Sequence, residues 1–201
     1  MDVTGGRRAI RIPGYDYSQP GAYYVTIVVH GRENLLGVIT DGQMRLNKYG
    51  QVVQQAWFDL PNHYAHVELD AFTVMPNHVH SILILSRGGS EAGSGDDLQA
   101  GVLRNSACHA NPPETRPYYR RHPLSDIVRA FKSFSARRIN LLRHTTGIPV
   151  WQRNYYEHVI RDNMDYRSKS TYILENPLHW GDDDENVVLQ SRLRRSFFRS
   201  E

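Results

Sequence analysis

The segment AHVELDAFTVMPNHVHSILIL, residues 65–85, contains two runs of β-branched and apolar residues on either side of Pro76 and Asn77. Residues of these types favour extended strands, whereas proline followed by asparagine favours a turn. We therefore expect two strands joined by a short turn. His78 and His80 begin the second run, and in a strand a spacing of two places both imidazoles on the same face.

The residues before this segment predict a strand, a hairpin and a helix. Residues 22–31 are rich in β-branched and aromatic side chains and end in glycine, which is typical of a buried strand. Asp41 and Gly42 form a turn signal between two short apolar runs, which predicts a hairpin. The apolar positions of 47–64 recur at helical spacing until Pro61 ends the pattern.

The residues after the segment predict two helices and a strand. Apolar positions share one helical face in 125–143, with Ser125 as the N-cap. Residues 150–160 are typical of a strand, and a second helix, capped by Asp162 or Asn163, follows. Helices interspersed with mainly antiparallel strands indicate an α+β fold, in which helices cover one face of a single sheet.

Composition limits what the chain can be. With 201 residues it can bury one sizeable core, and its 40% hydrophobic and 22% charged residues exclude a wholly disordered chain. Cys108 is the one cysteine, which excludes an intramolecular disulfide and fits a reducing compartment. No secretory signal and no apolar run of bilayer-spanning length is visible, so we expect a soluble, cytoplasmic protein.

The sequence predicts one domain and an uneven distribution of basic residues. We expect a single domain over 1–186, in which the Gly-, Ser- and Pro-rich stretch 87–123 is a flexible insertion, followed by a basic tail over 187–201. The net charge is only +3, but basic residues cluster in 116–123, in 129–144 and in the tail. This distribution suggests a polyanionic partner, with a merely solvated surface as the alternative.

The histidine pair has two interpretations from spacing alone. Histidines at this spacing can hold a divalent metal, or grip a phosphate if they are protonated, but they can also lie partly exposed on the wet face of a sheet. Two histidines are too few for a metal site. Tyr172 and Asn176, four residues apart, share a helical face, and an amide oxygen suits a hard ion such as Mg²⁺ or Mn²⁺. The alternative for Tyr172 is a core or capping aromatic.

Several motifs in order resemble one known family. MPNHVH, WQRNYYEHVIRD and YILENP, together with PGAYYVTIVVHGREN and the helical FKSFSARRIN, are similar to the single-tyrosine HUH transposases, and most similar to the REP-associated tyrosine transposases. The resemblance covers the chain from Tyr15 to about Trp180. It implies a ferredoxin-like α+β core.

The resemblance also implies roles for individual residues. His78 and His80 match the metal-binding histidines, and Tyr172 matches the nucleophile on the last helix. Asn176 falls at the position of the third ligand, where insertion-sequence relatives usually have glutamine and the REP-associated branch has asparagine. The ion would be Mg²⁺ or Mn²⁺. Three other tyrosines are rivals that lack the Tyr-x-x-x-Asn spacing: Tyr155, Tyr156 and Tyr166.

The implied activity is metal-dependent cleavage and transfer of single-stranded DNA near REP-type hairpins, through a covalent 5′-phosphotyrosine intermediate. This is the chemistry of transposition and DNA recombination. Basic residues expected to contact the DNA are Arg129, Lys132, Arg153, Arg194 and Arg195. The sequence leaves open whether the protein is a monomer or a homodimer.

The alternatives to this activity are a nucleotide-processing enzyme and a DNA-binding protein without cleavage activity. A histidine-triad nucleotide hydrolase or transferase needs a third histidine two residues after His80, where this chain has Ile82. A domesticated relative would bind hairpin DNA without cutting it, and this alternative stays open.

Overall fold

An antiparallel sheet of four strands, in the order β4-β5-β1-β6, forms the middle layer of the molecule. The computed structural model describes residues 11–87, 121–183 and 185–186. The strands are β1 (Gly21–Val28), β4 (Val67–Val74), β5 (His78–Leu85) and β6 (Tyr156–Ile160). β5 pairs with β1 on one side and with β4 on the other, so the strand that carries the two histidines lies inside the sheet.

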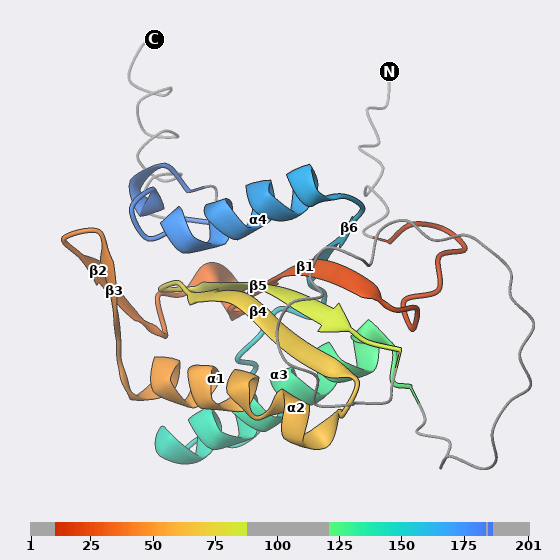
Figure 1. The fold of residues 1–201 in the computed structure, drawn as a ribbon. Coiled ribbons are helices and arrows are strands. Elements are labelled where there is room, and N and C mark those ends of the chain that lie inside the picture. The colour runs from red at the N-terminus through yellow and green to blue at the C-terminus, as the bar shows by residue number, and fades with distance from the viewer. Residues whose placement is uncertain (1–10, 88–120, 184, 187–201) are drawn as a thin grey trace, which may run out of the picture.

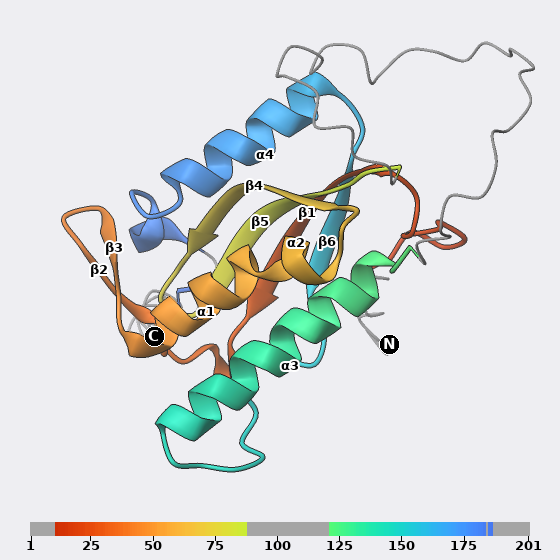
Figure 2. The ribbon, with the colours of Figure 1, turned by 60° about the horizontal axis from the view of Figure 1, so that its bottom comes forward.

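Helices lie on both faces of this sheet (Figures 1 and 2). α1 (Lys48–Phe58), the short α2 (Leu60–His63) and α3 (Leu124–Leu142) cover one face. α4 (Asn163–Glu175) crosses the other. A separate hairpin of β2 (Gly37–Thr40) and β3 (Gln43–Leu46) precedes α1, and two 3-10 turns, His30–Arg32 and Trp180–Asp182, complete the described elements.

The α+β fold class and the mainly antiparallel sheet are as expected. β1, α1, β4, β5, α3 and β6 follow one another as a β-α-β-β-α-β unit, which is the ferredoxin-like arrangement. We expected helices on one face of the sheet only. The two helices of this unit, α1 and α3, do share one face, but α4 does not lie there. That helix lies on the opposite face because its buried Ile173 packs with Tyr24, Ala71 and Ile82.

Alternation along β1 assigns side chains to the two faces. Tyr23, Val25 and Ile27 are fully buried in the larger apolar cluster, which α1 and α3 cover. Tyr24 and Thr26, between them, lie on the face of α4.

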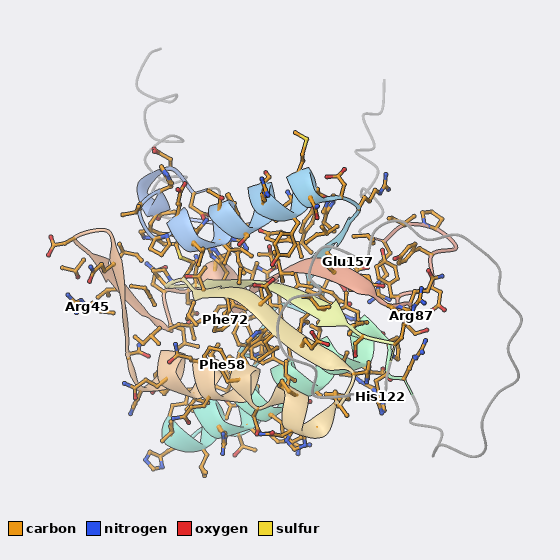
Figure 3. All side chains as sticks on the ribbon, in the orientation of Figure 1. Arg45, Phe58, Phe72, Arg87, His122 and Glu157 are labelled. Carbon is orange, nitrogen blue, oxygen red and sulfur yellow. The ribbon has the colours of Figure 1, made fainter. Side chains whose placement is uncertain are left out.

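Aromatic side chains fill the layer between α1 and the sheet. Trp57 stacks on Phe72, with ring centroids 5.2 Å apart, and meets the edge of Phe131 at 4.9 Å. Figure 3 shows Phe58 and Phe72 between α1 and β4. The core therefore forms on the side of the sheet away from the histidines.

Two predicted element ends are correct. The Asp41-Gly42 turn joins β2 to β3, with both residues at positive φ. Asp162 caps α4, because its side chain accepts a hydrogen bond from the backbone N–H of Asp165.

Three other ends differ from the prediction. Pro61 lies in the first turn of α2, where a missing N–H costs no helical hydrogen bond. Pro123, not Ser125, is the N-cap of α3, and no side chain caps that end. β6 begins only at Tyr156, because residues 152–154 turn their carbonyl groups toward α3 instead of a neighbouring strand.

Some predictions fall outside the described residues. These are most of the insertion 87–123 and the whole tail 187–201, including Arg194 and Arg195. Among the helices that are described, none has the length and apolar character needed to cross a bilayer.

Candidate active site

His78 and His80 lie in the interior of the sheet and face α4. Their side chains are buried, with 0% and 3% exposure, and their Nε2 atoms are 2.9 Å apart. Two nitrogens bound to one ion at about 2.1 Å each and at about a right angle would be separated by about 3 Å. The burial contradicts the alternative of two partly exposed histidines, and the separation fits ligands of a shared ion.

Each of the two histidines has a hydrogen-bond partner on its outer ring nitrogen, Nδ1. His78 Nδ1 lies 2.8 Å from Asn77 Oδ1, an amide oxygen that can only accept. In the neutral imidazole of His78, Nδ1 is then the N–H, and Nε2 presents a lone pair. His80 Nδ1 lies 2.8 Å from both the Tyr24 hydroxyl and Thr26 Oγ1, two groups that can each donate or accept.

Burial also keeps both imidazoles neutral. It lowers the pKa of His78 from 6.5 to about 4, against the opposing effect of the Asp183 carboxylate. It lowers the pKa of His80 well below 6.5, and His78 and Lys169 add to the effect. The neutral imidazole is the metal-binding form. A doubly protonated pair that grips a phosphate is therefore not the resting state at neutral pH.

A carboxylate lies close to the two imidazoles. The side-chain ligand atoms of His78, His80 and Asp183 all lie within 4.8 Å of one another, and Asp183 Oδ2 is 3.9 Å from His78 Nε2. Asp183 Oδ2 and Asn176 Oδ1 are buried, and neither has a hydrogen-bond partner among the described residues. A buried oxygen without a partner is unfavourable, and a cation would satisfy it. The two imidazole nitrogens and the Asp183 carboxylate oxygen fit a divalent ion.

Asn176 lies between two residues that contact the histidines. Tyr172, one helical turn before it, has its ring 5.2 Å from the ring of His80. Trp180, four residues after it, has its ring 6.0 Å from the ring of His78. Asn176 itself is buried, with 2% exposure.

Tyr172 is placed differently from its rivals. It is 47% exposed on α4 and meets the rings of both His80 and Tyr24. Tyr166 donates a hydrogen bond to Asp70, and Tyr155 accepts one from Arg11 on the other side of the sheet. Tyr156 meets Tyr24 at 6.1 Å, but no ring contact with either histidine is found for it among the described residues.

Asn77 links the histidine pair to the segment after α4. Its Nδ2 donates to the carbonyl oxygen of Glu185 at 2.6 Å and to that of Arg32 at 3.2 Å. The Arg32 guanidinium forms an ion pair with the Glu185 carboxylate at 2.8 Å. These contacts hold the segment that carries Asp183 against β5.

The sequence did not single out Asn77, Asp183 or Lys169. Asn77 directly precedes the histidine pair and Asp183 lies in the acidic run GDDDEN, so both were visible in the printed sequence. Nothing local indicated that this run folds back onto β5. Lys169 is three residues before Tyr172, and its ammonium lies 5.3 Å from the centre of the Tyr24 ring. It places a positive charge beside the cluster.

The predicted DNA-contacting residues that are described lie along α3 and the segment after it. Arg129 forms an ion pair with Asp126 at 3.2 Å. Lys132 Nζ donates to the carbonyl oxygens of Gln152 and Arg153, and burial lowers its pKa. The side chain of Arg153 is exposed. The structure does not bring these residues to the histidines, since α3 covers the opposite face of the sheet.

Comparison with known proteins supplies relatives of this chain, although no family model matches it. An uncharacterized protein of Haemophilus influenzae is 35% identical over 179 residues, which cover 88% of this chain and 91% of the relative. A second protein of that organism, whose given name places it among the REP-associated tyrosine transposases, is 23% identical over 166 residues, which cover 83% of this chain and 75% of the relative.

A solved structure shares the fold. It is that of a REP-associated tyrosine transposase bound to a REP hairpin, with a TM-score of 0.52 and 21% sequence identity. The match covers 85% of this chain and 74% of the other.

Proposed function

The chain belongs to the REP-associated tyrosine transposase-like proteins, and on this basis we propose that it cleaves and rejoins single-stranded DNA beside REP-type hairpins. One observation carries the proposal. The paired Nε2 atoms of His78 and His80 lie next to the buried Asp183 carboxylate, and the ring of His80 lies beside that of Tyr172.

The metal site would consist of His78, His80, Asn176 and Asp183. The paired Nε2 atoms, and two buried oxygens for which the described residues offer no hydrogen-bond partner, support this set. When bound, a divalent ion such as Mg²⁺ or Mn²⁺ would polarise the scissile phosphate and offset the charge that develops on it. Asn77, Tyr24 and Thr26 would orient the two imidazoles.

Tyr172 would be the nucleophile. Its hydroxyl oxygen forms a bond to phosphorus, while the bond from phosphorus to the 3′ oxygen breaks. The phenol loses its proton and the departing 3′ oxygen gains one, so the products are a 5′-phosphotyrosine ester and a free 3′-OH. Attack by a 3′-OH on that ester reverses the step, so rejoining needs no ATP. Lys169, on the same side of α4, would favour the phenolate and the phosphate by its charge.

DNA outside the reacting phosphate would be held by basic residues. Arg129 and Arg153 are exposed and suited to phosphate contact, and Arg194 and Arg195 in the tail are proposed for the same role. Lys132 is proposed to act chiefly through the backbone, since its ammonium binds the carbonyl groups beside Arg153.

The test is formation of a covalent adduct. The protein is incubated with Mn²⁺ and labelled single-stranded DNA that contains a REP-type hairpin, and the products are separated on a denaturing gel. Wild type should give a protein-linked product, and Tyr172→Phe should give none while it binds the hairpin as tightly. Tyr166→Phe is the matched control, because Tyr166 is a rival tyrosine on the same helix whose hydroxyl donates to Asp70, and it should retain the adduct.

Two results would contradict the proposal. An adduct in Tyr172→Phe would show that another residue is the nucleophile. Hairpin binding by wild type with no adduct in either Mg²⁺ or Mn²⁺ would instead support a hairpin-binding protein without cleavage activity.

A further inference from the structure

A cavity of about 910 Å³ lies between α3 and residues 148–155, on the side of the sheet away from the histidine pair. Apolar side chains that include Val128, Pro149 and Trp151 form part of its lining. Trp151 is fixed there because its Nε1 donates to Ser135 Oγ at 2.9 Å. Its size is that of a site for a small organic ligand.

Basic residues also line the cavity: Arg11, Arg129, Lys132 and Arg153. Among the described residues that line it, none is acidic. Each of the first three has a defined partner, namely Glu157 for Arg11, Asp126 for Arg129 and the backbone of 152–154 for Lys132. Arg153 is exposed, and no ion pair to it is found in the described part of the chain. Its charge is therefore available to an anionic ligand.

The contacts of Lys132 explain the path of residues 152–154 along the cavity. Lys132 Nζ donates to three consecutive carbonyl groups, at 2.5 Å, 3.0 Å and 3.4 Å, and so bends residues 152–154 around the end of its side chain. This bend holds Arg153 at the cavity and delays the start of β6 until Tyr156.

Two adjacent tyrosines connect the cavity to the candidate active site. Tyr155 lines the cavity, whereas Tyr156, paired with Thr26 of β1, lies on the opposite face with the histidines. Tyr156 is 53% exposed and its ring meets Tyr24, which in turn meets Tyr172. β6 is an edge strand, so a ligand can pass from one face to the other beside these two rings.

We propose that this cavity is a nucleotide-binding subsite, which holds one nucleotide of the single strand that leaves the Tyr172 site over the edge of β6. The base packs on the apolar lining and Tyr155, and its phosphate pairs with Arg153. Tyr156 stacks on the base that precedes it. The inference rests on the proposed function, since the strand it describes is the one that Tyr172 cleaves.

The test measures binding and location separately. Tyr172→Phe protein, which cannot cleave, is titrated into a fluorescent REP-type hairpin with or without a single-stranded flank. Arg153→Glu in this background should weaken binding of the flanked hairpin about tenfold and leave the bare hairpin unchanged. Arg138→Glu is the matched control, because Arg138 is exposed on α3 and does not line the cavity.

Location is read from crosslinking. Iodouracil placed at each flank position in turn should crosslink, at one position, to the peptide that contains Trp151 and Tyr155. Free deoxynucleoside monophosphate should compete only weakly, which identifies the strand and not a free nucleotide as the occupant.

The outcomes separate this inference from the proposed function. An adduct in wild type, with Arg153→Glu affecting both hairpins equally or no crosslink to 148–156, overturns the subsite alone. Strong competition by the free nucleotide overturns the strand as occupant. Absence of any hairpin binding overturns both the subsite and the function on which it rests.

Discussion

At the scale of single residues, Asn77 shows how one amide positions two parts of the candidate metal site. Its oxygen accepts from His78 Nδ1, which leaves Nε2 bare, and its nitrogen holds the Glu185 carbonyl group two residues from Asp183. Since this nitrogen donates to two carbonyl oxygens, the orientation of the amide is determined by its partners. The positions of His78 on β5 and of Asp183, far along the chain, thus depend on the same side chain.

Asn77→Asp tests this coupling. The carboxylate still accepts from His78, but it cannot donate to the two carbonyl groups and repels them. We expect the affinity for Mn²⁺, measured by titration calorimetry, to fall by about 10- to 100-fold. Glu185→Gln, which weakens only the ion pair with Arg32, should have a smaller effect. An affinity within about twofold of wild type in Asn77→Asp would contradict the coupling.

Asp183→Asn tests the carboxylate that the sequence did not single out. The change preserves shape and removes the charge that faces His78 Nε2 at 3.9 Å. We expect Mn²⁺ to raise the melting temperature of wild type and to raise that of Asp183→Asn much less, because at a given ion concentration tighter binding stabilises the folded state more. Asp182→Asn, one residue earlier and exposed, is the control and should behave as wild type.

At the scale of elements, α1 depends on a cap that also holds the hairpin before it. Asn47 Oδ1 accepts from the backbone N–H groups of Tyr49 and Gly50, and its Nδ2 donates to the carbonyl oxygen of Leu35. The cap thereby determines where the helix begins and how β3 leads into it. Gly50 lies in the first turn because a Cβ there would be 2.2 Å from the carbonyl oxygen of Leu36.

Asn47→Ala should lower the free energy of unfolding by about 1 to 2 kcal/mol, since both capping bonds and the link to Leu35 are lost. Urea denaturation followed by circular dichroism measures this. Gln54→Ala, on the exposed side of the same helix, should change it by less than about 0.5 kcal/mol. Equal effects of the two substitutions would mean that the cap contributes no more than an ordinary surface position.

At the scale of the whole molecule, the sheet separates the main apolar core from the candidate active site. The larger apolar cluster, which includes Trp57 and Phe131, lies under α1 and α3. The histidines lie on the other face, where the apolar cluster under α4 is much smaller. The fold therefore does not depend on an ion for its main core.

Removal of metal should accordingly abolish activity and leave the fold. After treatment with EDTA, the far-ultraviolet circular dichroism spectrum should be unchanged, while the covalent adduct with hairpin DNA should disappear and return with Mn²⁺. The segment 180–186 should lose protection against hydrogen exchange, because Asp183 joins it to the site. Cooperative unfolding in EDTA would show that the ion is part of the core.

Local patterns were sufficient for most elements and for part of the site. The Asp41-Gly42 turn, the Asp162 cap and the alternation of β1 depend on neighbours in sequence, so they could be predicted. The start of β6 could not, because it depends on Lys132, which reaches residues 152–154 from another element.

The sequence by itself determined the α+β element order and the shared face of His78 and His80. Through resemblance it also led us to expect that Tyr172 and Asn176 belong to the same site. These features follow from the periods of strands and helices or from short motifs. Only the tertiary structure decided that the imidazoles are buried and neutral, that Asp183 returns to them, and that Arg129, Lys132 and Arg153 surround a cavity on the other face. The reason is physical: desolvation and convergence of distant side chains arise from packing between elements, which no local pattern specifies.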